Sequence, residues 1–554
     1  MLRCRRAKDI LLALTGAAAL LCAANVAAQT PARPTPGSVG TQVDRPVIAP
    51  EAIPEAPIER PQEDTVRPPS SSMEIVVDRF VLTGNTLFDD AQLLEIIAEY
   101  TGKPITLEGI YEAADAIQRF YRREGYLLAS VYVPAQKVTS GTVRLEVIEG
   151  RISGIRIEGE LDSYDAGFLI DLFGTEKLGE IVSQQEMEER ILMLNDLPGL
   201  RARTIIVPGD HYGTSDVIIE IEEDRSTVVL RANNYGRVSL GEARLEAGWL
   251  YVNLLAQGDQ LNLSGIVAED SLMTFVRIDY DLLLNRHGTR AGGNISAFDY
   301  DVDTDELDLT GELGGDGNNF RIFINHPMVR SLYNRFDVLA AIRVAESSED
   351  GDLAFSTDTT TVELLDLGLL WQPTHRNGAF SSLGATFSSN FEDNPDRDKN
   401  DAVKAKLILD YTYLQPFGNN WFAQLGINLA FSEDPLPDVE RYRLGGPDNV
   451  RAYPATEVAG DEGQLYRFDL GKRINLGPRT NLIARVFYDH GTVERILPFP
   501  GEEDEEELSG YGIGALFEFG IHHSLDLMVA EPTSDFDSSD GEDTRFWINY
   551  ALRI

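Results

Sequence analysis

DTRFWINYALRI, residues 543–554, ends the chain and decides its fold. Its side chains alternate in character, and successive side chains of a β-strand point to opposite faces. One face would be wholly apolar, with Phe546, Ile548, Tyr550, Leu552 and Ile554. The other would be mixed, with Trp547, Asn549, Ala551 and Arg553. This pattern predicts a strand with apolar surroundings on one side and polar neighbours on the other.

The same alternation recurs from residue 226 to the end, in segments of about ten residues, which is the length of a tilted membrane strand. We count sixteen such segments, which begin near residues 227, 242, 258, 273, 288, 319, 334, 361, 379, 402, 420, 462, 480, 511, 522 and 543.

The connections between these segments also alternate. Short, neutral or basic connections such as 285–288 and 374–378 take turns with longer, acidic ones such as 392–401 and 502–507. A soluble β-sandwich is the alternative, but the polar content of the second face and the parity of the connections count against it. The pattern predicts a 16-stranded antiparallel transmembrane β-barrel with short turns in the periplasm and acidic loops outside the cell.

Length, charge and apolar content limit the class of protein and its partners. The chain has 554 residues, a formal net charge of -42 and 43% hydrophobic residues. That length suggests several domains, and the apolar content excludes wholesale disorder. The acidic charge argues against a nucleic-acid partner, because phosphates would repel it.

Residues 1–28 read as a secretory signal peptide. A basic start precedes an apolar run at residues 10–24, and the small residues Ala27 and Ala28 fit a cleavage site. A retained membrane anchor is the alternative. Both cysteines, Cys4 and Cys22, lie in this segment, so the mature chain would have no disulfide.

Three segments precede the barrel. Residues 29–72 contain ten prolines, which predict an extended, partly polyproline-like linker and argue against a helix there. Residues 73–149 combine two helical periodicities with several alternating strands. Residues 150–225 repeat that pattern, so we expect two similar α/β domains.

Residues 443–453, RLGGPDNVRAY, join turn residues to one arginine between apolar neighbours. Downstream, residues 487–491 read FYDHG on a strand whose Asp489 would face the lumen. An arginine at a loop tip often just faces water. A bidentate pair between Arg451 and Asp489 would instead pin the loop, residues 433–461, to the barrel wall. Since we expect a wet lumen, the pair should add little net stability and should serve to position the loop or to switch the pore.

Residues 73–554 resemble the outer-membrane transporters of two-partner secretion, the TpsB proteins of the haemolysin-activator (ShlB, FhaC, HecB) type. They belong to a superfamily of barrel transporters and insertases with periplasmic POTRA domains. The motifs that carry the resemblance are GYLLASVYVPAQ at 125–136, LNDLPGL at 194–200, VRAY at 450–453 and FYDHG at 487–491. The family's loop tip has Gly where this chain has Ala452, and a positive φ at that position would cost stability.

The resemblance implies POTRA domains at 73–149 and 150–225 and a barrel at 226–554 whose loop 433–461 folds inward. It implies that Val450, Tyr453, Phe487 and Gly491 support the Arg451–Asp489 pin. It also implies client-binding residues among Tyr126, Tyr132, Pro134 and Gln136.

The function implied is capture of an unfolded exoprotein in the periplasm through the POTRA domains, by β-augmentation, and its export through the pore. The client would be a TpsA-like, β-helical protein. Further partners would be outer-membrane lipid, lipopolysaccharide and, during biogenesis, the barrel assembly machinery. The transporter itself would be a monomer. We expect no enzymatic activity, catalytic residue, cofactor or metal.

Two alternatives remain open. An assembly factor that inserts other barrels shares the architecture, although such factors usually have more POTRA repeats. A passive porin or an outer-membrane enzyme is the second alternative. A porin needs no periplasmic arm, and the residues offer no catalytic constellation.

Overall fold

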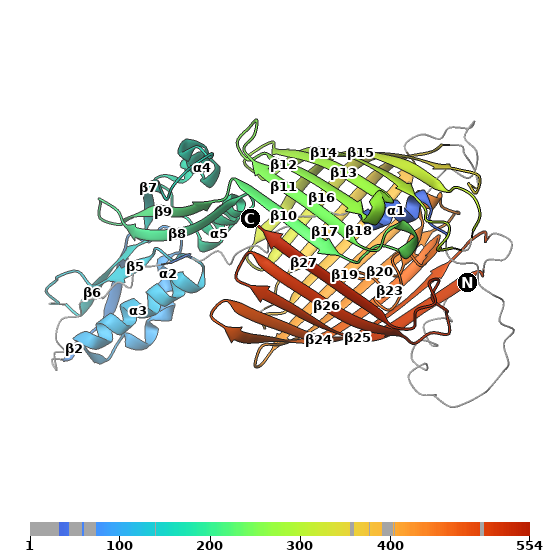
Figure 1. The fold of residues 1–554 in the computed structure, drawn as a ribbon. Helices are drawn as coiled ribbons and strands as arrows, with labels where there is room; N and C mark the ends of the chain where they lie inside the picture. Colours follow the sequence, from blue (N-terminus) through green and yellow to red (C-terminus); the bar gives the residue numbers. More distant parts are fainter. Residues whose placement is uncertain are drawn as a thin grey trace, which may run out of the picture.

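A computed structural model describes residues 33–43, 58–59, 74–138, 140–307, 309–354, 359–375, 377–390, 403, 405–498 and 503–554. The expected signal peptide and most of the proline-rich linker lie outside the described residues. Two small α/β units stand in a row at one end of a large β-barrel (Figure 1).

The first α/β unit packs helices against a three-stranded sheet with strand order β3-β6-β5. Its long helix, α3, begins where the Thr106 hydroxyl accepts a hydrogen bond from the backbone N–H of Gly109, which is N-terminal capping. The apolar face of α3, including Ile110, Ile117 and Tyr121, is buried in the core. The elements are β2 (Glu74–Val76), β3 (Arg79–Thr83), α2 (Asp90–Ile96), β4 (Pro104–Thr106), α3 (Leu107–Arg123), β5 (Ser130–Tyr132) and β6 (Thr142–Ile148).

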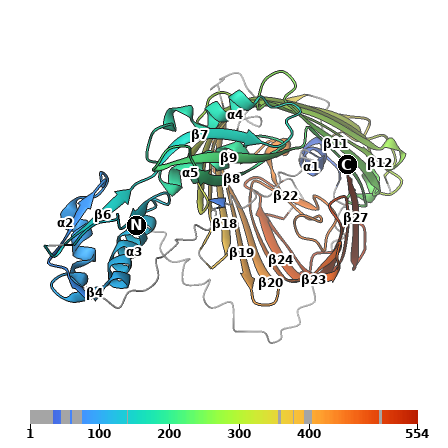
Figure 2. The same ribbon diagram turned by 90° about the vertical axis from the view of Figure 1, so that its left-hand side faces the viewer.

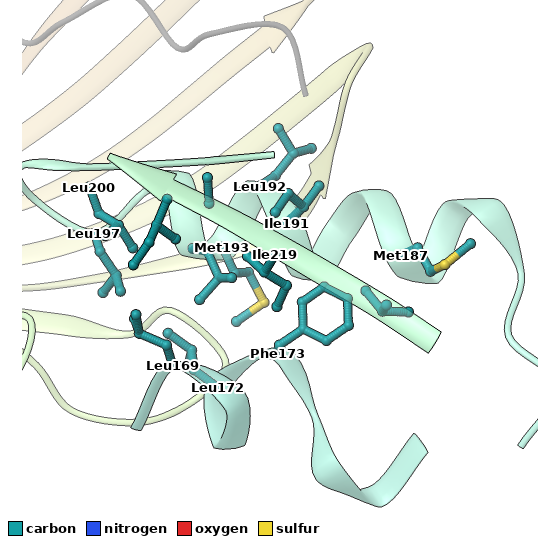
Figure 3. Packing of buried hydrophobic residues seen from close by; sticks show 14 of the residues in the cluster. Leu169, Leu172, Phe173, Met187, Ile191, Leu192, Met193, Leu197, Leu200 and Ile219 are labelled. Atoms are coloured by element: carbon teal, nitrogen blue, oxygen red, sulfur yellow. The ribbon is translucent and has the colours of Figure 1, made fainter. Parts of the chain in front are cut away.

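The second unit repeats this plan. Two helices cover one face of its sheet, and their apolar residues, such as Leu169, Phe173 and Ile191, meet Ile219 of the sheet (Figure 3). A capping box of Ser183 and Glu186 starts the second helix. The elements are β7 (Arg151–Glu158), α4 (Ala166–Phe173), α5 (Gln184–Asn195), β8 (Leu200–Pro208) and β9 (Thr214–Glu223).

A short piece of the linker adds a fourth strand to this second sheet. β1 (Ile58–Glu59) lies parallel to β8, with Ile58 opposite Thr204. The sheet order is therefore β1-β8-β9-β7. The β8 edge thus accepts an extended segment by backbone pairing, a contact that the linker's composition did not predict.

Sixteen antiparallel strands form one closed barrel in sequence order, which confirms the predicted fold class. The strands are β10 (Ser226–Asn233), β11 (Arg244–Val252), β12 (Gln260–Ala268), β13 (Met273–Leu283), β14 (Arg290–Asp301), β15 (Gly314–Ser331), β16 (Asn334–Asp350), β17 (Thr360–Pro373), β18 (Phe380–Asn390), β19 (Lys406–Phe417), β20 (Trp421–Ser432), β23 (Glu462–Gly477), β24 (Thr480–Glu494), β25 (Glu505–Phe519), β26 (His523–Pro532) and β27 (Arg545–Arg553).

The last strand has the predicted orientation. Phe546 on its outer face is 51% exposed, whereas Trp547 on its inner face is 1% exposed. β27 pairs with β10 and so closes the barrel. Within the described part of the chain, no helix has the length and apolar character needed to cross a bilayer.

One predicted loop is partly strand. We placed residues 502–507 in a solvated acidic loop, but Glu505, Glu506 and Glu507 lie in β25 and pair with the end of β24. The reason is that the backbone ladder continues past the apolar band, where charged side chains on a strand are free to face water.

The second α/β unit is fixed to the barrel rim. Asp196 accepts two hydrogen bonds of 2.7 Å from Arg330, at the end of β15. Leu283, at the end of β13, and Leu332, in the turn after β15, pack against the hydrophobic core of the α/β unit. This joint holds the unit next to the barrel opening.

The proline-rich linker contains a helix, contrary to our prediction. α1 (Pro36–Val43) lies inside the ring of barrel strands (Figure 2). Pro36 is the first helical residue, where proline is tolerated because no intrahelical N–H is needed. Thr35 precedes it, and its hydroxyl accepts from the backbone N–H of Ser38, which caps the helix. Counting prolines was misleading, since position relative to the helix start decides their effect.

Candidate functional site

The inward-folded loop, residues 433–461, contacts the inner wall of the barrel through several residues. It contains the 3-10 turn η6 (Asp438–Glu440) and a hairpin of β21 (Tyr442–Leu444) and β22 (Val458–Gly460). This hairpin lies within the ring of strands (Figure 2). Gly445 and Gly446 have φ values of 103° and 114°, which only glycine adopts readily. They turn the chain so that residues 450–453 reach the wall.

Arg451 forms a bidentate ion pair with Asp489 of the barrel wall. Its Nε donates to Asp489 Oδ2 at 2.8 Å and its Nη2 donates to Asp489 Oδ1 at 2.7 Å. The backbone N–H of Arg451 also donates to Asp489 Oδ2 at 3.1 Å. Such a paired, planar geometry fixes direction as well as distance.

A second carboxylate shares this arginine. Arg451 Nη1 donates to Asp469 Oδ1 at 2.8 Å. Asp469 lies on β23, where it stands opposite Phe487 of β24. We predicted one acid for this arginine and missed Asp469, because only the register between two strands brings it beside Asp489. The available signal was its place among inward-facing residues of the neighbouring strand.

The ion pair is not in a wet lumen as we expected. Arg451 is 5% exposed and Asp489 is fully buried. The guanidinium lies 3.6 Å from the centre of the Phe487 ring, and Trp547 Nε1 donates to the backbone carbonyl of Arg451 at 2.8 Å. The apolar residues of the inward loop seal the site from water. Removing one partner would therefore leave a buried charge unpaired, at a cost of about 3–5 kcal/mol.

The supporting residues lie around this contact. Val450 and Tyr453 are fully buried, and the Tyr453 hydroxyl lies 2.7 Å from Ser534 Oγ. A side chain at Gly491 would meet the Leu444 side chain at 2.8 Å, so this glycine makes room for the hairpin.

Ala452 causes no backbone strain. Ala452 is not among the residues with positive φ. Having alanine in place of glycine there therefore does not cost stability through backbone strain. Its methyl group points at Gly510 of β25, where any added Cβ would clash with it. The chain thus has a glycine on the wall where the alanine of the loop needs space.

A second ion pair holds the inward loop at Glu457, just before β22. Arg237 Nη2 donates to Glu457 Oε2 at 3.2 Å, and both side chains are buried. Glu457 also accepts from the Ser539 hydroxyl at 2.7 Å. Neither Arg237 nor Glu457 was predicted, since nothing in their sequence context separates them from ordinary loop charges.

The predicted client-binding residues divide into two groups. Tyr126 packs its ring against Phe88, 5.8 Å between centroids, as part of the core of the first unit. Tyr132 lies on β5, an edge strand, and its ring contacts Tyr212 of the second unit at 5.9 Å. Gln136 pairs with the backbone of Arg144 on β6. Only Tyr132, Pro134 and Gln136 share one edge, and Gln136 is already engaged.

A buried carboxylate stabilises the turn beside that first core. Glu149 accepts from Tyr121 Oη at 2.9 Å and from the backbone N–H groups of Thr86 and Leu87. Burial alone would raise the pKa of Glu149, but these hydrogen bonds and that of the Thr86 hydroxyl outweigh it and lower the pKa. The group therefore stays ionised, as a structural anchor of the first unit.

Two sequence profiles match the chain. Residues 75–150 match the ShlB-type POTRA domain, and residues 352–517 match the haemolysin secretion/activation protein ShlB/FhaC/HecB. Among curated proteins, the haem/hemopexin transporter protein HuxB of Haemophilus influenzae is 23% identical over 540 residues, which covers 93% of this chain and 94% of HuxB. The outer membrane transporter CdiB of Escherichia coli is 22% identical over 412 residues, 71% of this chain and 68% of CdiB.

Solved structures show the same fold. CdiB from Escherichia coli superposes with a TM-score of 0.72 at 18% identity and covers 94% of this chain and 100% of that chain. BamA from Haemophilus ducreyi lacking POTRA domains 1-3 has a TM-score of 0.52 at 16% identity, over 87% of this chain. The POTRA profile, the ShlB/FhaC/HecB profile and the transporter relatives agree with the sixteen-stranded barrel and its two α/β units. In these two profiles and in its fold, the chain is similar to the POTRA-barrel outer-membrane transporters of the two-partner secretion, ShlB/FhaC/HecB type.

Proposed function

We propose that this protein captures one unfolded exoprotein in the periplasm and exports it through its barrel. The observation that carries the proposal is the contact of Asp196 with Arg330, which holds the second α/β unit beside the opening of a barrel whose lumen contains two further elements. These elements are α1 and the inward loop. A pore with an α/β unit at its entrance and two elements folded into its lumen suits controlled passage of a polypeptide.

Capture would use the outer edge of the first POTRA sheet, where the backbone N–H of Val131 donates to Gln118 Oε1. β5 is an edge strand of that sheet, and β8 occupies the corresponding place in the second repeat. The β8 edge already pairs with β1 of the linker. A strand edge of this type therefore accepts extended chain in this protein, which supports β-augmentation at β5.

The Val133→Pro variant is expected to reduce client binding to the POTRA units at least tenfold. Proline removes the backbone N–H just after β5, which an added client strand needs as a donor. Val133→Ala is the matched control, because it shortens the same side chain and keeps the N–H. Binding of the purified client fragment to the full transporter in detergent provides the measurement. Equal loss in both variants would exclude edge pairing at this position.

The protein would lie in the bacterial outer membrane. We place the POTRA units in the periplasm, the longer acidic loops outside the cell, and outer-membrane lipid and lipopolysaccharide around a monomeric barrel that the barrel assembly machinery inserts. The client would be exported unfolded and fold outside as a TpsA-like, β-helical protein.

An assembly factor is the second candidate, because the BamA structure shares the fold. Deleting the protein from its host separates the two. Mass spectrometry of the medium and of the outer membrane should show loss of one or two large exoproteins with other barrels unchanged. A general decrease of outer-membrane barrels would establish the assembly role instead.

A further inference from the structure

The part of the inward loop before its hairpin, residues 433–441, is called the near arm, and it carries a buried carboxylate whose partners differ from those of Arg451. Glu440, in η6, is 3% exposed. Its Oε1 accepts from Arg343 Nη1 at 2.5 Å, and its Oε2 accepts from Arg343 Nη2 at 3.2 Å and Lys406 Nζ at 3.1 Å. Lys406 also donates to the backbone carbonyl of Glu440 at 2.5 Å. Two wall cations thus hold one loop carboxylate.

This contact lies on a different part of the wall. Arg343 belongs to β16 and Lys406 to β19, whereas Asp469 and Asp489 belong to β23 and β24. The barrel order places β17 and β18 between the first two strands, and β20 between β19 and β23. The inward loop therefore contacts different wall strands through its near arm and its tip.

The wall does not need Glu440 to neutralise Arg343. Asp366, on β17, already lies 3.4 Å from Arg343 Nε and is itself buried. A carboxylate of the wall is therefore in place, and the loop adds a further one. Glu440 balances the second wall cation, Lys406, so the contact ties the loop to the wall through charges on both sides.

The same 3-10 turn also holds the helix in the lumen. Asp438 Oδ2 accepts from the backbone N–H of Gly37, at the start of α1, at 2.8 Å. Asp438 Oδ1 accepts from Arg443 Nη2 at 2.5 Å, and Arg443 lies 3.4 Å from Thr35 Oγ1. A carboxylate at a helix N-terminus is favoured by the exposed N–H groups and the helix dipole.

We propose that Glu440 is a second anchor of the inward loop, independent of Arg451, and that η6 links this anchor to α1. Release of the near arm then loosens both the loop and the helix, whereas release of Arg451 frees the tip alone. Glu440 is a positioning residue for transport. The inference rests on the proposed transport function only for its consequence in secretion, because the anchoring itself is measurable without a client.

The test is the conductance of the purified full-length protein in planar lipid bilayers. Glu440→Gln keeps the shape of the side chain and removes the charge that both cations need. We expect about a tenfold increase in the time spent at the open level, the change that follows from losing about 1.4 kcal/mol of anchoring. Combined with Arg451→Ala, it should open the pore further than either variant, because the two anchors act on separate arms.

Two further variants keep this test decisive. Glu440→Asp retains the charge and should stay near the wild-type conductance. Asp526→Asn is the matched control, since it removes a lumenal ion pair of similar size, 2.7 Å from Arg485, that joins β24 to β26 without touching the loop. Heat-modifiable migration on gels verifies that each barrel is assembled.

The outcomes are separable. Unchanged conductance of assembled Glu440→Gln, or an equal increase in Asp526→Asn, would overturn the second anchor. An open pore in Glu440→Gln with an unaffected set of secreted proteins in the host would support the anchor and count against the transport function.

Discussion

Arg451→Ala is expected to reduce client secretion at least tenfold while the barrel still reaches the outer membrane. The substitution leaves Asp489 and Asp469 as two buried carboxylates without their cation, since Arg451 Nη1 and Nη2 bridge them at 2.8 and 2.7 Å. Loss of a buried partner costs about 3–5 kcal/mol. The cost falls on the loop tip, because the closed ladder of strands still holds the wall. Secretion is measured by quantifying the client in the medium.

The companion variants sharpen this expectation. Arg451→Lys retains the charge but loses the planar fork, so it should fall between wild type and Arg451→Ala. Arg485→Ala removes an arginine from the same strand as Asp489 without changing the loop and should secrete normally. Wild-type secretion by assembled Arg451→Ala would show that the tip contact has no role in export.

Val39→Asp is expected to open the pore of the resting protein, with an increase in single-channel open time of at least tenfold. Val39 of α1 is 1% exposed and packs with Leu240, Ile266 and Phe275 of the barrel interior. An unpaired aspartate there carries a large desolvation penalty, which drives the helix out of its site. Planar-bilayer recordings give the conductance, and sensitivity of the host to large antibiotics gives an independent measure.

Thr41→Asp is the matched control for that variant. Thr41 belongs to the same helix and is exposed, so the added charge can remain hydrated. If both variants open the pore equally, charge on the helix matters and burial of Val39 does not. If neither does, α1 does not obstruct the conducting path.

Several features of the barrel were predictable because they depend on local periodicity. A side-chain period of two is a property of any strand, so the faces of residues 543–554 could be assigned without a structure, and Phe546 and Trp547 lie as expected. The number of strands followed from the same repeat, and the closed barrel has sixteen. The two α/β units were recognisable for a similar reason, since their helices carry apolar residues at helical spacing.

The pairing of Arg451 with Asp489 was predicted, but the other charged contacts of the loop were not. The sequence near Arg451 and Asp489 indicated one pair, because neighbouring residues do not reveal how many opposite charges a side chain will contact in the fold. Asp469 joins them because the register of β23 against β24 puts it beside Phe487, and Glu440 meets Arg343 because the loop folds back across the lumen. Both contacts join residues that are distant along the chain.

The sequence by itself determined the alternating strands and the two repeats, because each is encoded in neighbouring residues, whereas the inward loop was expected from the resemblance of residues 450–453 to the family's motif. Only the tertiary structure decided which acids share Arg451, that the site is dry, and that a proline-rich segment forms a helix. α1 is too short to be stable alone. It exists because the barrel interior buries Val39 and because Asp438 caps its first turn from the loop.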